Sequence, residues 1–258
     1  LYAPGVGDNT SGVAVLLSLP ELPGVVRGFT VGEEGLGNLK GARALVEALS
    51  PEVVVAVDGY LPGVVDRALG SVRLRVRLQG PGGHAWGDRR LPHPVFALAE
   101  GLCRVRALVE GREDASVNAS GLEGGQAVNA LPQEAACLLE VRALAALLQG
   151  VEAAFAEAAR AHRVGLALEV LGRRPAGRTA TPRLLQAAER ALAEVGERPQ
   201  WLPGSTDASA AIERGIPALG FGVYRGGGAH TPGEWVLPSS LLEGQRALLA
   251  LLRGLGVG

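Results

Sequence analysis

Residues 53–57 read Val-Val-Val-Ala-Val, a run dominated by β-branched side chains that predicts a strand buried on both faces. The segments before this run alternate between two patterns. Residues 12–19 and 39–49 have apolar residues at helical spacing, whereas residues 25–31 (VVRGFTV) predict another strand. This strand–helix–strand order predicts an α/β layer with a parallel sheet.

A different pattern begins at residues 71–78 (SVRLRVRL), where apolar residues and arginines alternate strictly. Such alternation predicts a strand with one solvated face, as antiparallel sheets have. The elements expected after it are a helix at 92–105, strands at 115–120 and 134–142, a helix at 145–161 and a strand at 164–171. Together these segments have the β-α-β-β-α-β order of a split-βαβ sandwich.

The α/β character returns near residue 178, where Thr181 is expected to cap a helix that has Pro182 at its first position. We therefore predict one α/β domain with a second domain inserted into it. The α/β domain consists of residues 1–70 and 178–258, and the inserted α+β domain of residues 71–177.

Composition excludes several classes of protein. Lys and Arg total 25 and Asp and Glu total 26, so no basic surplus indicates nucleic-acid binding. The longest apolar runs, such as residues 247–252, are far shorter than a membrane span. Two cysteines, Cys103 and Cys137, are too few for a disulfide framework, and we interpret them as small buried residues. We expect a cytoplasmic protein.

Acidic residues and a histidine stand where predicted strands end: Asp8, the pair Glu33 and Glu34, Asp58, and His230. Each carboxylate alone is more often a helix cap or a solvated loop residue. In open α/β sheets, however, ligands bind beyond the carboxyl ends of the strands. Carboxylates that converge there repel one another unless a cation or a shared proton neutralises them. A zinc, manganese or cobalt ion suits mixed carboxylate and histidine ligands, and arginine is the structural alternative.

Five motifs in this order resemble those of the co-catalytic zinc exopeptidases and deacylases. This family includes peptidase T, carnosinase-type dipeptidases, glutamate carboxypeptidase, aminoacylase and succinyl-diaminopimelate desuccinylase. The motifs are Gly7-Asp8-Asn9, Val31-Gly32-Glu33-Glu34, Asp58, Gly80-Pro81-Gly82-Gly83-His84 and Ala229-His230-Thr231-Pro232-Gly233-Glu234-Trp235. The resemblance implies a mixed sheet flanked by helices, with an inserted α+β lid that also forms a homodimer.

The resemblance also implies a metal centre with two divalent ions, zinc in the first place and cobalt or manganese as alternatives. Asp8 would bridge the ions, and the peptide bond that follows it would be cis. Glu34 and Asp58 would bind opposite ions, and His230 would be a further ligand. Glu33 would be the general base that takes a proton from the attacking water.

Residues of the lid would contact the substrate. His84 resembles the lid histidine that reaches the partner subunit's active site and stabilises the tetrahedral intermediate, although a lone histidine is more often structural. Asn129 resembles an asparagine near the substrate, and Arg142 an arginine that pairs with a substrate carboxylate. Gly204, in the catalytic domain, resembles a backbone contact to the substrate.

The expected partners are a short peptide or an N-acyl amino acid and a second copy of the chain, with no nucleic acid and no membrane. Within the family that the chain resembles, an aspartate at position 58 and the sequence VGEEGL at residues 31–36 favour a di- or tripeptide aminopeptidase. The alternatives are an N-acyl-amino-acid deacylase or carboxypeptidase, and a non-catalytic homologue that acts as a dimeric binding module. No His-x-Asp motif precedes Asp8 as it does in the family, so we expect residues to be missing upstream.

Overall fold

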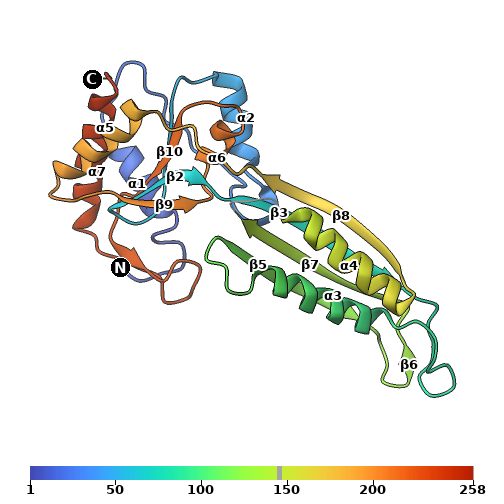
Figure 1. Cartoon of the computed structure of the whole chain (residues 1–258). Helices are drawn as coiled ribbons and strands as arrows, with labels where there is room; N and C mark the ends of the chain where they lie inside the picture. The colour runs from blue at the N-terminus through green and yellow to red at the C-terminus, as the bar shows by residue number, and fades with distance from the viewer. Residues whose placement is uncertain (144–146, 258) are drawn as a thin grey trace. The chain divides into compact units, whose positions relative to one another are not determined.

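The computed structural model describes residues 1–143 and 147–257, which form two compact units (Figure 1). The first unit consists of Leu1–Leu69 and Gly177–Gly258, and the second of Gly70–Ala176. Among the described residues, no helix has both the length and the apolar composition of a membrane span.

A four-stranded sheet forms the centre of the first unit, with the strands in the order β1, β10, β2, β9. These strands are β1 (Val54–Val57), β10 (Ala218–Phe221), β2 (Gly63–Ala68) and β9 (Gln200–Gly204). β1 is parallel to β10, and β2 is parallel to β9, but β2 is antiparallel to β10. The sheet is therefore mixed, as the resemblance implies, although the strand–helix–strand pattern alone predicted a parallel sheet. The short connection from β1 to β2 cannot return the chain to the starting edge of the sheet, so β2 runs opposite to both β1 and β10.

Helices cover both faces of this sheet (Figure 1). One face packs against α1 (Thr10–Ser18), α5 (Pro182–Ala193) and α7 (Ser240–Gly254), and the other against α2 (Lys40–Leu49) and α6 (Ala208–Ile212). Val57 and Phe221 point to the first core, whereas Ala56 and Ala218 point to the second, as alternation along a strand requires. The Thr181 hydroxyl accepts the Leu184 N–H at 3.3 Å and caps α5, as predicted.

Residues 25–31 do not form the strand that their composition predicts. Val26, Phe29 and Val31 are exposed, and among the described residues β1 pairs with β10 alone. The carbonyl of Val31 instead accepts the N–H of Gly41 in α2, at 2.9 Å. β-Branched residues favour a strand only where a neighbouring strand satisfies the backbone, and residues 25–30 have no such ladder in the described structure.

The second unit contains an antiparallel sheet in the order β5, β7, β3, β8. The strands are β3 (Gly70–Gln79), β5 (Ala115–Gly124), β7 (Glu134–Ala143) and β8 (Gly165–Arg174), with a short pair formed by β4 (Gly83–His84) and β6 (Ala130–Leu131). Two helices, α3 (Pro94–Val109) and α4 (Leu148–His162), lie against this sheet (Figure 1). Leu74, Val76 and Leu78 form the buried face of β3, as the alternation predicts.

The second unit differs from the sequence-based expectations at the start of one helix, at one cysteine and at one arginine. The helix predicted from 145 begins at Leu148, and its first two residues lie outside the described residues. Cys137 is buried as expected, but Cys103 is exposed. α3 buries Ala97, Leu98, Gly101 and Val105, and position 103 is on the opposite side of the helix. The arginine at position 73, expected on a solvated face, is buried and paired with Glu140 at 2.8 Å.

Candidate metal centre

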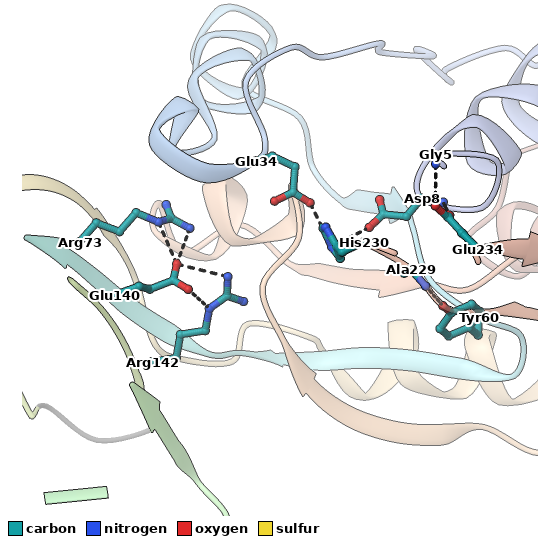
Figure 2. Close-up of polar contacts among 10 residues, drawn as sticks. All are labelled: Gly5, Asp8, Glu34, Tyr60, Arg73, Glu140, Arg142, Ala229, His230 and Glu234. Carbon is teal, nitrogen blue, oxygen red and sulfur yellow. Dashed lines mark hydrogen bonds and ion pairs between the residues drawn. The ribbon is translucent and has the colours of Figure 1, made fainter. Parts of the chain in front are cut away.

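Three of the predicted ligands meet in the first unit. Each of Asp8, Glu34 and His230 offers one ligand atom, and these atoms all lie within 4.8 Å of one another. His230 Nε2 lies 3.1 Å from Asp8 Oδ2 and 3.6 Å from Glu34 Oε1 (Figure 2). Asp8 precedes α1, and Glu34 precedes the short 3-10 helix η1 (Gly35–Gly37). Residues far apart in the sequence thus form one group of imidazole and carboxylate ligands.

The loop that carries Asp8 is held at the end of β1. Its Asp8–Asn9 peptide bond is cis, as the resemblance implies. The side-chain amide of Asn9 donates a hydrogen bond to the Val57 carbonyl at 2.9 Å. A Cβ on Gly12 would lie 2.6 Å from the same carbonyl oxygen, so only glycine allows α1 to begin this close to the strand.

The loop that carries His230 connects the hairpin strands β11 (Gly226–Gly227) and β12 (Trp235–Val236). His230 has a left-handed backbone, with φ of 63°. The Ala229 N–H donates to the Tyr60 hydroxyl at 3.2 Å (Figure 2), and the Thr231 hydroxyl donates to the Gly228 carbonyl at 2.7 Å. These bonds fix the backbone on both sides of the histidine.

Asp58 follows β1 directly, and its N–H donates to the Phe221 carbonyl of β10 at 3.2 Å. Burial raises the pKa of Asp58 to about 7, and the negative charges of Asp8, Glu33 and Asp207 contribute to this shift. Asp58 is not among the residues whose ligand atoms lie mutually within 4.8 Å. It is nevertheless close enough to the other acids for their charges to raise its pKa, and it lies at the carboxyl end of β1.

Negative charge is in excess at this site. Burial, followed by the charge of Glu34, raises the pKa of Asp8, while His230 acts in the opposite direction. Among the described residues, His230 is the only basic side chain that forms an ion pair with Asp8 or Glu34. Arginine neutralisation, the structural alternative, is therefore not what the structure shows for these two carboxylates.

Two acids near the site were not singled out in the sequence. Glu234 is 2% exposed, and its carboxylate accepts the N–H groups of Gly5, Gly7 and Asp8, which lower its pKa. Asp207, which precedes α6, accepts the Thr30 hydroxyl at 2.5 Å. Glu234 belongs to the same motif as His230, and Asp207 ends a Gly-Ser-Thr-Asp turn, so each had a weak local signal.

The two remaining candidates of the first unit are half-buried. Glu33 immediately precedes Glu34 and contributes to the raised pKa of Asp58. Gly204 ends β9, and its carbonyl accepts the Leu69 N–H at 2.6 Å. The roles expected for Glu33 and Gly204 stay predictions.

His84 and Asn129 belong to the second unit, in segments that the short β4–β6 pair connects. His84 Nδ1 accepts the N–H groups of Trp86 at 3.3 Å and Gly87 at 3.2 Å. The Asn129 carbonyl accepts the Ala85 N–H at 2.9 Å. A neutral ring whose Nδ1 accepts carries its proton on Nε2, which makes Nε2 a donor. The roles of both residues toward a substrate stay predictions.

Arg142 also belongs to the second unit, on β7. Its guanidinium pairs with Glu140 at 2.8 and 3.2 Å, and Glu140 pairs with Arg73 as well (Figure 2). The side chains of Arg142 and Arg73 lower the pKa of Glu140 despite its partial burial. Two guanidinium groups thus share the carboxylate of Glu140, and the role of Arg142 toward a substrate stays a prediction.

The model of peptidase family M20/M25/M40 matches residues 1–254 of the chain. The fold of the chain is similar to that of aminopeptidase PepT from Bacillus cereus ATCC 10987. The TM-score is 0.74 and the sequence identity is 20%, over 97% of this chain and 71% of that one. A tripeptidase from Staphylococcus aureus subsp. aureus Mu50 gives a TM-score of 0.73 and 21% identity over 87% of this chain and 62% of that one.

A hydantoinase/carbamoylase family amidase from Burkholderia ambifaria is also similar, with a TM-score of 0.62 and 19% identity over 80% of this chain and 54% of that one. The chain thus spans less than two thirds of the tripeptidase and about half of the amidase. No curated protein matches its sequence. The match to the family model extends over almost the whole chain, and the chain belongs to peptidase family M20/M25/M40.

Proposed function

We propose that this protein is a metal-dependent hydrolase that cleaves an amide bond of short peptides, as a di- or tripeptide aminopeptidase. The observation that carries the proposal is the convergence of Asp8, Glu34 and His230 in a chain of this peptidase family. The similarity in fold to an aminopeptidase and a tripeptidase supports it.

The residues present fit divalent cations. The group offers two carboxylates and one imidazole, and the raised pKa values of Asp8 and Asp58 reflect buried negative charge that a cation would offset. We propose two ions, zinc in the first place and cobalt or manganese as alternatives. Asp8 would contact both ions, Glu34 and Asp58 would hold opposite ions, and His230 would complete the set.

When bound, the cations would polarise the scissile carbonyl and lower the pKa of water. Glu33 would accept the proton of the attacking water and pass it to the leaving amine. His84, with its proton on Nε2, would donate a hydrogen bond to the developing oxyanion in the partner subunit. Arg142 would pair with the substrate carboxylate, Asn129 would lie near the substrate, and the backbone of Gly204 would contact it.

A substrate screen tests this proposal. The full-length protein, loaded with Zn²⁺, Co²⁺ or Mn²⁺, is incubated with tripeptides and dipeptides, with the same peptides acetylated at the amino terminus, and with N-acyl amino acids. We expect cleavage of the peptides that have a free amino group and little of the acetylated ones. The Glu33→Gln variant, prepared identically, controls for contaminating peptidases.

The same screen discriminates the second candidate, an N-acyl-amino-acid deacylase or carboxypeptidase, which the similarity in fold to an amidase favours. Preferential hydrolysis of N-acyl amino acids would replace the aminopeptidase assignment with this one. Hydrolysis of neither class by the metal-loaded full-length protein would favour a non-catalytic homologue.

A further inference from the structure

The carboxylate of Glu234 is almost completely buried beneath the loop that carries Asp8. Its Oε1 accepts the N–H groups of Gly7 and Asp8, both at 2.8 Å, and its Oε2 accepts the N–H of Gly5 at 2.6 Å. Its exposed fraction is 2%. Figure 2 shows this carboxylate next to Asp8 and Gly5. Three charge-assisted bonds to one short loop fix the position of its backbone strongly.

The close approach of Glu234 to the loop leaves no space for a side chain at Gly7. A Cβ on Gly7 would lie 2.9 Å from Glu234 Oε1 and 2.8 Å from the Tyr224 hydroxyl. The absence of a side chain at Gly7 therefore allows its N–H to donate directly to the Glu234 carboxylate. The carboxylate therefore holds the backbone of residues 5–8 in place, and this backbone determines the point from which the Asp8 side chain extends.

Glu234 also belongs to the segment that carries His230. Its own carbonyl accepts the Ala3 N–H at 3.1 Å, and Leu1 and Val236 exchange two backbone hydrogen bonds at 2.9 Å. The amino-terminal segment is therefore fastened to this hairpin by backbone bonds that do not involve the carboxylate. The carboxylate of Glu234, four residues after His230 in the sequence, accepts the N–H of Asp8 directly.

We infer that Glu234 is a positioning residue, which holds the Asp8 carboxylate opposite His230 and so determines the affinity of the site for a divalent cation. This inference rests on the proposed function. Glu234 is not itself offered as a ligand, because it is almost completely buried and is not among the residues whose ligand atoms converge. Residues that orient metal ligands without touching the ion commonly account for about 10–100-fold in affinity.

Substitution of Glu234 by Gln tests the inference with little change of shape. One oxygen becomes an NH₂ group, which cannot accept a hydrogen bond, so at least one of the three N–H groups loses its partner. Co²⁺ is titrated into the wild-type chain and the variant, and binding is followed by visible absorption and equilibrium dialysis. We expect the Co²⁺ Kd of E234Q to rise about 10-fold or more, with a changed absorption spectrum.

The matched control is Glu243→Gln, which removes the charge of a carboxylate on α7 that pairs with Arg225 at 3.3 Å. We expect its Co²⁺ Kd and spectrum to equal those of the wild type. A purely structural role for Glu234 would lower the Tm of E234Q and leave the Kd and spectrum of the folded protein unchanged. That result would overturn the inference.

If E234Q shows no cooperative unfolding transition, Glu234→Asp takes its place, because it keeps the charge and withdraws the oxygens by one methylene. A raised Co²⁺ Kd in E234D supports the inference, and a wild-type Kd overturns it. A wild-type chain that does not bind Co²⁺ contradicts both this inference and the proposed function. A wild-type chain that binds Co²⁺ no better than E234Q contradicts the inference alone.

Discussion

The carboxyl group of Asp58 shows how the metal-free site affects stability at the scale of a residue. Burial and then the charges of Asp8 and Glu33 raise its pKa from 3.8 to about 7. Between these values the folded chain binds more protons at Asp58 than the unfolded chain does. The stability of the metal-free protein therefore falls as the pH rises through this window.

Replacement of Asp58 by Asn removes that dependence. We expect metal-free D58N to have a Tm at least about 5 °C above that of the wild type near pH 8, with the difference shrinking as the pH falls toward 4. Differential scanning calorimetry in the presence of a chelator measures this. A difference that grows on acidification, or none near pH 8, contradicts the pKa assignment. Zn²⁺ is expected to raise the Tm of the wild type more than that of D58N.

Glu33 and Glu34 are adjacent but have different proposed roles. We expect Glu33→Gln to keep Co²⁺ affinity and to lose about 10²–10⁴-fold in the rate of peptide hydrolysis, because the amide cannot accept the proton. Glu34→Gln, the matched control, is expected to weaken Co²⁺ binding instead. Loss of metal from E33Q with retention in E34Q would mean that the two roles are exchanged.

The residues of the candidate site were predictable to different extents. Asp8, Glu34 and His230 stood out because each is a polar residue that follows an apolar or glycine-rich segment. Glu234 did not, because its function depends on N–H groups more than 220 positions away in the chain. Backbone donors are present at almost every residue, so the sequence has no pattern that indicates which of them a buried carboxylate binds.

At the scale of an element, α7 shows how closely helices approach the sheet of the first unit. A Cβ on Gly244 would lie 1.8 Å from the carbonyl oxygen of Val223, just beyond β10. We expect Gly244→Ala to lower the free energy of unfolding by about 2 kcal/mol or more, because α7 must move away from the strand.

Urea denaturation of the metal-free chain measures this effect. Leu242→Ala, a change on the same helix at a side chain that is 62% exposed, is the control and is expected to stay within about 0.5 kcal/mol of the wild type. Equal stability of G244A and the wild type would contradict the close approach of α7 to Val223.

Periodicity predicted the elements whose burial is regular and failed elsewhere. The alternation at 71–78 and the helical spacing at 39–49 correspond to β3 and α2. β2 and β9 were not predicted, because β2 contains the buried Asp66 and β9 contains Pro203, which are unusual in strands. Residues 25–31 show the opposite error, since their strand-like composition has no neighbouring strand among the described residues.

At the scale of the whole molecule, the division into two units raises the question of assembly. We propose a homodimer formed through the second unit, in which His84 acts in the active site of the partner subunit. Sedimentation velocity is expected to show a dimer. A monomer with full hydrolytic activity would contradict the role assigned to His84.

Mixed dimers test the same role. We expect His84→Ala and Glu33→Gln each to be nearly inactive alone, because each lacks one part of the machinery. After subunit exchange, a mixed dimer would contain one site with both residues intact, and hydrolysis is expected to reappear. Exchange confirmed by sedimentation of labelled subunits, without recovered activity, would place His84 in the site of its own subunit.

We propose that the acids gathered near the carboxyl end of β1 hold divalent cations. The most direct test is the zinc content of the wild-type chain and of Asp8→Asn after equilibrium dialysis, measured by mass spectrometry of the metal. We expect the wild type to retain zinc and D8N to lose it. A wild-type chain without zinc, or a D8N variant with as much zinc as the wild type, would contradict it.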